Sequence, residues 1–286
     1  MKNVFINVNF EKSKAIKVLS RFELWALKNK IAIYSLDNFE KYSKKIKSIK
    51  KFTLNRRDKK FINESFAVSF GGDGTMLSSA RLVSNIGIPL LGINLGSLGF
   101  LSTVKEDLME KKLEMVLKGR YELERCDILE AKEKLNTITA FNDIIMLSKE
   151  FQRLIRIKID VDGKNISTTS ADGVVISTPK GSTAYSMSAG GPIVFSDVRC
   201  FIITPICPHL LVQRSIVVKS TSEIRLTPPL SDAVISGDSQ LKLKINRNES
   251  VIIKKYRKSV NLIKFSDIDF IDIMKEKFFL GRDPRL

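Results

Sequence analysis

The sequence predicts an α/β domain followed by a β-rich domain, so the fold class is α/β plus all-β. In the first third, short apolar runs alternate with segments whose apolar residues recur at helical spacing, and Ser65–Phe70 is followed by Gly71-Gly72 and a helical segment over Met76–Val83. Beyond about residue 120, apolar and polar residues alternate, which is typical of antiparallel strands with one buried face. We therefore expect a Rossmann-like α/β domain and a β-sandwich-like domain.

The first domain begins with an apolar run at Val4–Val8 and a second buried strand at Ile31–Leu36. A helix is predicted between them because its apolar residues fall on one face: Ala15, Ile16, Leu19, Phe22 and Trp25/Ala26. Glu106–Leu117 predicts another helix, closed by Gly119. The strand, glycine turn and helix over 65–83 are the arrangement that places ligands at the carboxyl edge of a parallel sheet.

In the second domain, Ile155–Val161 alternates apolar with charged residues and ends at the turn Asp162-Gly163. The alternation recurs over Leu241–Ile245. A terminal helix is predicted over Asp269–Leu280, packing back on the first domain. The expected domains are 1–101 with 256–286, and 102–255.

Composition excludes several classes of protein. With 43% hydrophobic and 28% charged residues over 286 positions, the chain has enough apolar material for packed cores. Three cysteines without a CxxC spacing and a single histidine argue against a disulfide scaffold or a structural zinc site. The longest uncharged stretch, Leu82–Val104, is interrupted by glycines, and Met1–Phe10 lacks a signal-peptide pattern. We expect a cytoplasmic protein without a membrane partner.

The net charge of +17 favours binding of polyanions or phosphorylated small molecules without choosing among them. The densest basic cluster, Lys41–Lys60, holds ten basic residues against Asp58. We interpret it as a solvated surface, because such runs are usually exposed and no aromatic residues interleave with it to stack on bases. No nucleic-acid partner is expected.

The turn Gly71-Gly72-Asp73-Gly74-Thr75 is the sharpest local signal for chemistry. Its glycines allow close backbone approach, and the following helix offers the positive end of its dipole to a phosphate. Asp73 would repel a phosphate, so we interpret it as a proton acceptor from a hydroxyl or as a group facing Mg²⁺. The alternative is a plain Asp-Gly turn between strand and helix.

A second candidate segment, Ser170–Ile193, is crowded with Ser, Thr and Gly. Such a segment buries little apolar area, which favours a bound ligand over an ordinary β loop. Asp172 can accept from ribose hydroxyls, Thr183 and Ser188 can donate, and the backbone at Ala184 can approach a flat ring beside Tyr185.

Two common nucleotide motifs are missing. The sequence has no GxxxxGK[ST], and the glycines over Gly92–Gly99 are wrongly spaced for GxGxxG. A P-loop enzyme and a hydride-transferring dehydrogenase are therefore disfavoured.

Five segments together resemble the NAD kinase family: GGDGTML at 71–77, GINLGSLGFL at 92–101, FND at 141–143, ADGVVISTPKGSTAYSMSAGGPI at 171–193 and PICPH at 205–209. GGDGT alone is ambiguous, because lipid kinases of the diacylglycerol type carry it too. The GSTAYSMSAGGP block is more specific, and the resemblance is strongest over 65–240.

The resemblance implies transfer of the γ-phosphoryl group of ATP, or of polyphosphate, to the 2′-hydroxyl of the adenosine ribose of NAD, giving NADP. Asp73 then matches the general base, with Gly74 beside it. The implied nucleotide-binding residues are Asn142, Asp143, Arg153, Asp172, Thr183, Ala184, Tyr185, Ser188 and Gln240. The resemblance also implies a homo-oligomer, either dimer or tetramer. Mg²⁺ or another divalent cation is expected because hard phosphate oxygens favour it, and no residue is assigned as a metal ligand.

The sequence departs from the family pattern at three positions. Asp143 replaces the usual glutamate, Ser239 follows Asp238 where glycine is common, and Lys180 stands where threonine is frequent. His209 remains open between a structural and a functional role. The competing interpretations are a GGDGT-type lipid kinase and a non-catalytic nucleotide- or polyanion-binding protein of the same fold.

Overall fold

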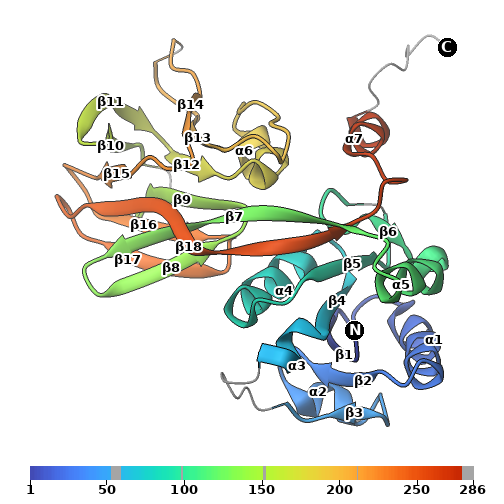
Figure 1. Cartoon of the computed structure of the whole chain (residues 1–286). Helices are drawn as coiled ribbons and strands as arrows, with labels where there is room; N and C mark the ends of the chain where they lie inside the picture. Colours follow the sequence, from blue (N-terminus) through green and yellow to red (C-terminus); the bar gives the residue numbers. More distant parts are fainter. Residues whose placement is uncertain (53–58, 98, 151–152, 211, 279–286) are drawn as a thin grey trace. The chain divides into compact units, whose positions relative to one another are not determined.

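The computed structural model describes residues 1–52, 59–97, 99–150, 153–210 and 212–278. The chain divides into two compact units, Met1–Arg125 with Val260–Leu286, and Cys126–Ser259 (Figure 1). The division falls later than the border we expected after residue 101, because the helix at Met109–Leu117 buries Met109, Leu113 and Val116 in the first unit's core.

The first unit is an α/β domain. Its sheet runs in the order β18 (Val251–Lys264), β5, β4, β1, β2, β3, with β6 beside β5, and its strand pairs are parallel. Its elements are β1 (Asn3–Val8), α1 (Ala15–Lys28), β2 (Ala32–Ser35), α2 (Phe39–Ser43), β3 (Ile49–Lys50), α3 (Lys59–Asn63), β4 (Ser65–Gly71), α4 (Asp73–Ile86), β5 (Leu90–Asn94), β6 (Val104–Lys105), the 3-10 turn η1 (Glu106–Leu108), α5 (Met109–Leu117) and α7 (Phe270–Phe278).

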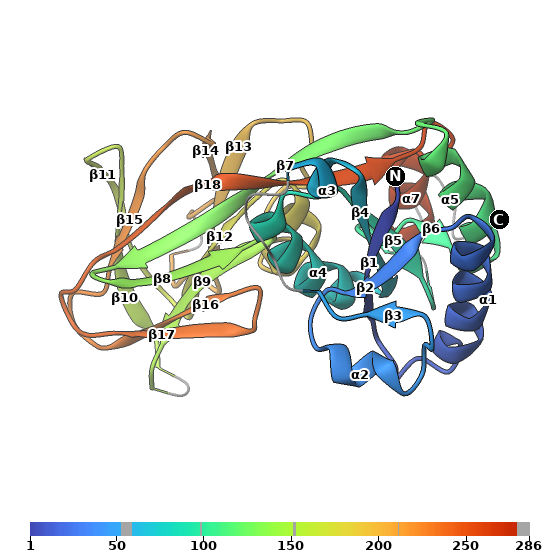
Figure 2. The same cartoon turned by 60° about the horizontal axis from the view of Figure 1, so that its bottom comes forward.

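Helices cover both faces of this sheet (Figure 2). Buried residues of α1 and α5 pack with Val4, Ile6 and Val8 of β1 in one core. Side chains alternate along a strand, so Asn7 points to the other face, where its amide contacts α4. Helix α4 thus lies across the sheet from α1 and α5, as both views show.

The prediction for the buried face of α1 is wrong at one residue, Ile16. Ile16 is 52% exposed, whereas Val18, which the pattern left out, is buried at 2%. The buried face is therefore centred on Ala15, Val18, Leu19, Phe22, Trp25 and Ala26. Ile16 lies about 100° around the helix from Ala15, on the side turned to solvent.

The second unit consists of two antiparallel sheets. One has the order β14, β13, β12, β9, β16, β17, and the other contains β11, β10, β15 and β18 together with β7 and β8. Its elements are β7 (Glu122–Glu133), β8 (Asn136–Ala140), β9 (Asp143–Ser148), β10 (Ile155–Val161), β11 (Lys164–Ala171), β12 (Gly173–Ser177), η2 (Lys180–Thr183), α6 (Tyr185–Ser188), β13 (Cys200–Ile206), β14 (Ile216–Lys219), β15 (Ile224–Thr227), β16 (Ala233–Gly237), β17 (Leu241–Ile245) and β18 (Val251–Lys264).

One core joins the two sheets. It unites Ile144, Met146 and Ile176 of the first with Ile157, Leu226 and Ile253 of the second. The alternation at 155–161 is confirmed, and both residues of the turn Asp162-Gly163 have positive φ, 49° and 79°. The β-sandwich-like prediction is correct.

The predicted terminal helix is also confirmed within the first unit. Helix α7 buries Ile273, and the ring centroid of Phe270 lies 6.0 Å from that of Phe100. The lysines of the basic cluster are exposed over 41–51 and 59–60, while residues 53–58 lie outside the described chain. Among the described residues, no helix is long and apolar enough to cross a membrane.

Candidate functional site

Asp73 lies at the first turn of α4, directly after the fully buried strand β4. Gly71 is required there for space, because a Cβ would meet Oγ1 of Thr75 at 2.2 Å. Gly72 precedes the helix with extended backbone, at φ −106° and ψ −165°. Gly74 is exposed, and a Cβ there would meet nothing within 4 Å. The predicted strand, turn and helix are therefore confirmed.

The carboxylate of Asp73 is held by a backbone turn about thirty residues further along the chain. Oδ2 accepts from the N–H of Phe100 at 2.9 Å, and Oδ1 accepts from the N–H groups of Leu101 and Ser102 at 3.1 and 3.0 Å. Three donors fix the rotation of this side chain. The carboxylate is thereby given one orientation at the start of α4.

The glycines of the GINLGSLGFL segment explain how this turn comes so close. A Cβ on Gly99 would lie 1.9 Å from Oδ1 of Asp73, and a Cβ on Gly92 would lie 2.8 Å from Sδ of Met76. Sequence reasoning used this segment only as a resemblance and missed the contact of residues 100–102 with Asp73. Gly99 was the only sequence feature that could have indicated this contact.

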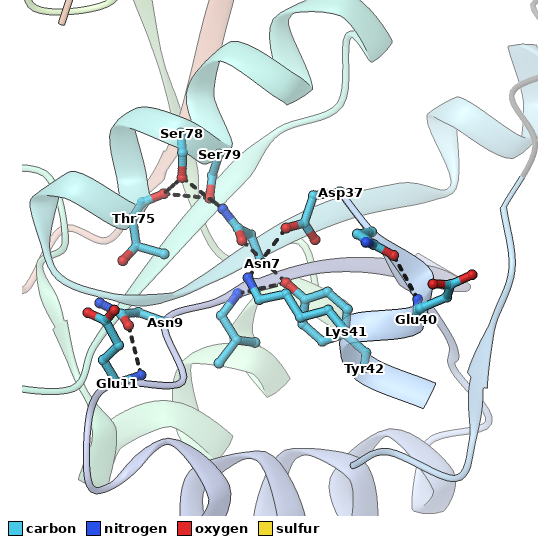
Figure 3. A network of polar contacts seen from close by, with 12 residues as sticks. Asn7, Asn9, Glu11, Asp37, Glu40, Lys41, Tyr42, Thr75, Ser78 and Ser79 are labelled. Carbon is cyan, nitrogen blue, oxygen red and sulfur yellow. Dashed lines mark hydrogen bonds and ion pairs between the residues drawn. The ribbon is translucent and has the colours of Figure 1, made fainter. Parts of the chain in front are cut away.

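The amide of Asn7 ties the first turns of α4 to the sheet (Figure 3). Nδ2 donates to Oγ of Ser78 at 2.9 Å and to Oγ of Ser79 at 3.0 Å, and both hydroxyls donate to the carbonyl of Thr75. Oδ1 accepts from the hydroxyl of Tyr42 at 3.3 Å. Burial and the neighbouring Asp37 raise the pKa of Tyr42, so this hydroxyl stays protonated. The network positions the helix that carries Asp73.

In the second unit, Asn142 and Asp143 lie beside Asp238, 96 residues from Asn142 in sequence. The carboxylate of Asp238 accepts from the backbone N–H groups of Phe141, Asn142 and Asp143 at 2.9, 2.8 and 3.3 Å. The N–H of Asp238 donates back to the carbonyl of Asp143 at 3.0 Å. Asp238 therefore fixes the backbone of the FND segment, a role the sequence did not indicate.

The STPKG segment closes on the same backbone. The hydroxyl of Thr178 donates to the carbonyl of Phe141 at 2.8 Å, and its N–H donates to the carbonyl of Asn142 at 2.9 Å. Gly181 packs so closely that a Cβ would lie 2.0 Å from the carbonyl oxygen of Asn142. Two predicted site segments, far apart in sequence, are thus in contact.

Two side chains of this cluster stand out chemically. Oδ1 of Asn142 is buried and accepts no hydrogen bond among the described residues, which leaves an acceptor available to a ligand. Asp143 is 4% exposed, and burial together with the nearby charge of Asp238 raises its pKa to about 7. The site can therefore offer both an amide and a carboxyl group near neutral pH.

A turn forms at Asp238-Ser239 although glycine is missing there. Asp238 and Ser239 have positive φ of 47° and 57° between β16 and β17, and the N–H of Gln240 donates to the carbonyl of Gly237 at 3.0 Å. The turn forms with two non-glycine residues in the left-handed region, which costs stability.

The small-residue segment forms η2 and α6, and its side chains divide into two groups. Ser182 and Ser186 are buried and bond to Val194 and Thr204, which fixes the segment to its neighbours. The predicted site residues lie outward instead: Tyr185 is 44% exposed, Ser188 is exposed, and Thr183 and Ala184 are half-buried. Asp172, between β11 and β12, is exposed as well.

Arg153 and Gln240 are surface residues. Arg153 pairs with Glu150 at 2.6 Å and lines an open pocket of about 720 Å³ whose lining does not include Asn142 or Asp143. Gln240 is exposed at the start of β17. Among the residues left open, His209 is exposed and is held by its N–H on the carbonyl of Ser170, and Lys180 begins η2.

No cluster of three or more metal-ligating His, Cys, Asp or Glu side chains occurs among the described residues. The carboxylate of Asp73 already accepts three backbone hydrogen bonds.

Comparisons with known proteins agree over the whole described fold. The model of the ATP-NAD kinase N-terminal domain matches residues 4–121, and that of the ATP-NAD kinase C-terminal domain matches residues 141–265. An NAD kinase of Caldanaerobacter subterraneus subsp. tengcongensis is 38% identical, with 97% of this chain and 99% of the relative covered. One from Clostridium botulinum is 35% identical, with coverage of 97% and 96%.

A solved structure described as yeast NADH kinase complexed with NADH aligns with a TM-score of 0.88 at 25% identity, covering 100% of this chain and 90% of that one. The NAD kinase of Archaeoglobus fulgidus, at 24% identity and a TM-score of 0.75, covers 98% of this chain and 100% of its own and shares the fold. The lipid-kinase and non-catalytic alternatives are not favoured. With both domain models matched in order, this chain belongs to the NAD kinase family and is an NAD kinase.

Proposed function

We propose that this chain transfers the γ-phosphoryl group of ATP to the 2′-hydroxyl of the adenosine ribose of NAD, giving NADP, with Asp73 as the general base. The observation that carries the assignment is the carboxylate of Asp73, held in one orientation by the N–H groups of residues 100–102 at the start of α4. A secondary hydroxyl is a weak acid, so a fixed carboxylate accelerates its attack.

In this reaction, the ribose hydroxyl gives its proton to Asp73 as its oxygen forms a bond to the γ-phosphorus. The bond from that phosphorus to the bridging oxygen breaks, and ADP leaves. Because phosphoryl transfer depends on positioning and charge neutralisation, the glycine turn at 71–74 and one base are sufficient protein groups. The magnesium ion enters as part of the substrate MgATP.

The second unit supplies the proposed groups for NAD. The free acceptor Oδ1 of Asn142 suits a donor of the adenosine, either its exocyclic amine or a ribose hydroxyl. Thr183, Ala184, Tyr185 and Ser188 are assigned to the adenine surroundings, Asp172 and Asp143 to ribose hydroxyls. The exposure of Tyr185 and Ser188, and the partial exposure of Thr183 and Ala184, support this assignment.

Arg153 and Gln240 are assigned to the nucleotide more loosely, since they lie on the surface and Arg153 is paired with Glu150. We also propose that the chain works as a homo-oligomer in the reducing cytoplasm. Neither Cys200 nor Cys207 forms a disulfide among the described residues, and β14, an edge strand, carries Val217 at 52% exposure near Val212 at 81% in sequence. Sedimentation analysis distinguishes monomer, dimer and tetramer.

The test is NADP formation from NAD with ATP and Mg²⁺, measured through an NADP-specific dehydrogenase, with polyphosphate as a second donor. Asp73→Asn should lower kcat by roughly 10²- to 10⁴-fold, which corresponds to about 3 to 5 kcal/mol of barrier. Asp107→Asn is the matched control, because Asp107 is an exposed carboxylate of the same unit. A wild-type protein that makes no NADP with either donor refutes the proposal.

A further inference from the structure

We propose that the turn at Gly99–Ser102 is a positioning element for the base, and that it selects Oδ2 of Asp73 as the oxygen that takes the proton. This inference rests on the proposed function of Asp73. It goes beyond that function by assigning roles to residues that are not themselves the base, and to one of its two oxygen atoms.

The two carboxylate oxygens of Asp73 accept different numbers of hydrogen bonds. An ionised carboxylate has about four lone-pair directions, two on each oxygen. Oδ1 uses both, on the N–H groups of Leu101 and Ser102, whereas Oδ2 uses one, on the N–H of Phe100. One direction on Oδ2 stays available among the described contacts. A substrate hydroxyl that donates to Asp73 without breaking this arrangement must approach Oδ2.

The turn packs tightly against the carboxylate of Asp73 at Gly99. A Cβ on Gly99 would lie 1.9 Å from Oδ1, 2.5 Å from Cγ and 2.8 Å from Oδ2 of Asp73. The backbone therefore contacts the whole carboxylate, and any side chain at 99 would push it out of place. Space for the carboxylate therefore requires glycine at this position.

The turn is itself anchored by hydrogen bonds with Asn94 and Gly71. Nδ2 of Asn94, at the end of β5, donates to the carbonyl of Ser102 at 3.2 Å, and the hydroxyl of Ser102 donates to the carbonyl of Gly71 at 3.3 Å. Ser102 is fully buried at 0%. The turn is thus fixed to the ends of the two strands that flank α4, so the base and its holder share one rigid support.

The experiment is a double-mutant cycle between positions 99 and 73. Gly99→Ala should lower kcat by at least 10²-fold and change KM for NAD and ATP less than threefold, because it displaces a base and not a binding group. In an Asp73→Ala background, Gly99→Ala should lower kcat less than threefold further, since the displaced group is gone. Gly96→Ala is the matched control, because its Cβ would meet its nearest atoms only at 3.9 Å, and it should retain wild-type kcat.

Thermal unfolding of the four proteins of the cycle, namely the wild type, Gly99→Ala, Asp73→Ala and the double variant, gives a readout independent of activity. Gly99→Ala should lower Tm in the Asp73 protein and change it little in the Asp73→Ala protein, where the clash is relieved. Losses of kcat or Tm that are equal in both backgrounds overturn the inference. If the wild type makes no NADP while Tm shows the coupling, the proposed function fails and the contact stands.

Should Gly99→Ala not fold, Ser102→Ala replaces it. This variant removes only the hydroxyl that anchors the turn to Gly71 and adds no bulk. The proposal then requires kcat to fall at least threefold with unchanged KM, and a kcat equal to that of the wild type overturns it.

Discussion

The carboxyl group of Asp143 is buried beside the carboxylate of Asp238, and the loss of hydration together with the neighbouring charge raises the pKa of Asp143 from 3.8 to about 7. The carboxylate of Asp238 accepts hydrogen bonds from three backbone N–H groups, those of residues 141–143. The pair therefore holds one proton in the folded protein at pH values where both groups are ionised in the unfolded chain.

This proton predicts a pH dependence of stability. Between about pH 4 and pH 7 the folded state binds a proton that the unfolded state has released, so this contribution to the free energy of unfolding falls as pH rises. Asp143→Asn removes it. Denaturation followed by circular dichroism should show the variant gaining about 2.5 kcal/mol on the wild type between pH 5 and pH 8.

The exposed Asp107→Asn variant should follow the wild type through this pH range. An Asp143→Asn protein whose stability runs parallel to the wild type from pH 5 to pH 8 would show that Asp143 is ionised throughout.

The turn after Asp238 predicts a stabilising substitution. Ser239 has φ of 57°, a region that costs a non-glycine residue about 1 to 2 kcal/mol. Ser239→Gly relieves this cost and adds back about 0.4 to 1 kcal/mol of unfolded-state entropy. The net gain should be about 0.5 to 1 kcal/mol by chemical denaturation, and a loss of stability would contradict the strained turn.

The pair of the buried Lys112 with Asp267 predicts that replacing either residue changes the free energy of unfolding by a different amount. Lys112 is 1% exposed, with its ammonium 4.4 Å from the ring centroid of Phe265 and paired with the exposed Asp267. This pair lowers the pKa of Asp267. Asp267→Asn leaves a buried cation without its partner, and such losses cost about 3 to 5 kcal/mol.

Lys112→Met removes the charge and leaves Asp267 in water, so it should cost about 1 kcal/mol or less, since replacement of a buried charge by an apolar side chain is often near neutral. Denaturation monitored by Trp25, the single tryptophan and part of the same unit's core, compares the two variants. Equal losses would mean that the ammonium is hydrated in solution.

Sequence periodicity predicted the elements with a clear pattern, because alternation and helical spacing record which faces are buried. It placed strands at 4–8 and 155–161 correctly, and it placed a helix over 76–83, which in the structure extends over Asp73–Ile86. It could not predict the contacts of Asp73 with residues 100–102 or of Asp238 with residues 141–143. The donors there are backbone N–H groups, which every residue except proline carries, so the chain leaves no compositional trace of them.

The amide of Asn7 was overlooked for a related reason: a single asparagine in an apolar strand gives no pattern, although its three side-chain partners come from α2 and α4. Asn7 is 5% exposed. Asn7→Ala removes an acceptor from Tyr42 and the link from β1 to α4, which should cost about 1 to 3 kcal/mol. Because α4 begins at Asp73, kcat for NADP formation should fall with it.

Asn9→Ala is the matched control on the same stretch of chain. Its half-buried side chain accepts only the N–H of Glu11, at 2.9 Å, among the described contacts (Figure 3). It should change stability by about 0.5 kcal/mol or less. Unfolding followed by Trp25 fluorescence separates the two variants, and kcat measured beside it tests the link to Asp73. An Asn7→Ala protein as stable and active as Asn9→Ala would show that α4 is positioned by its apolar contacts with the sheet alone.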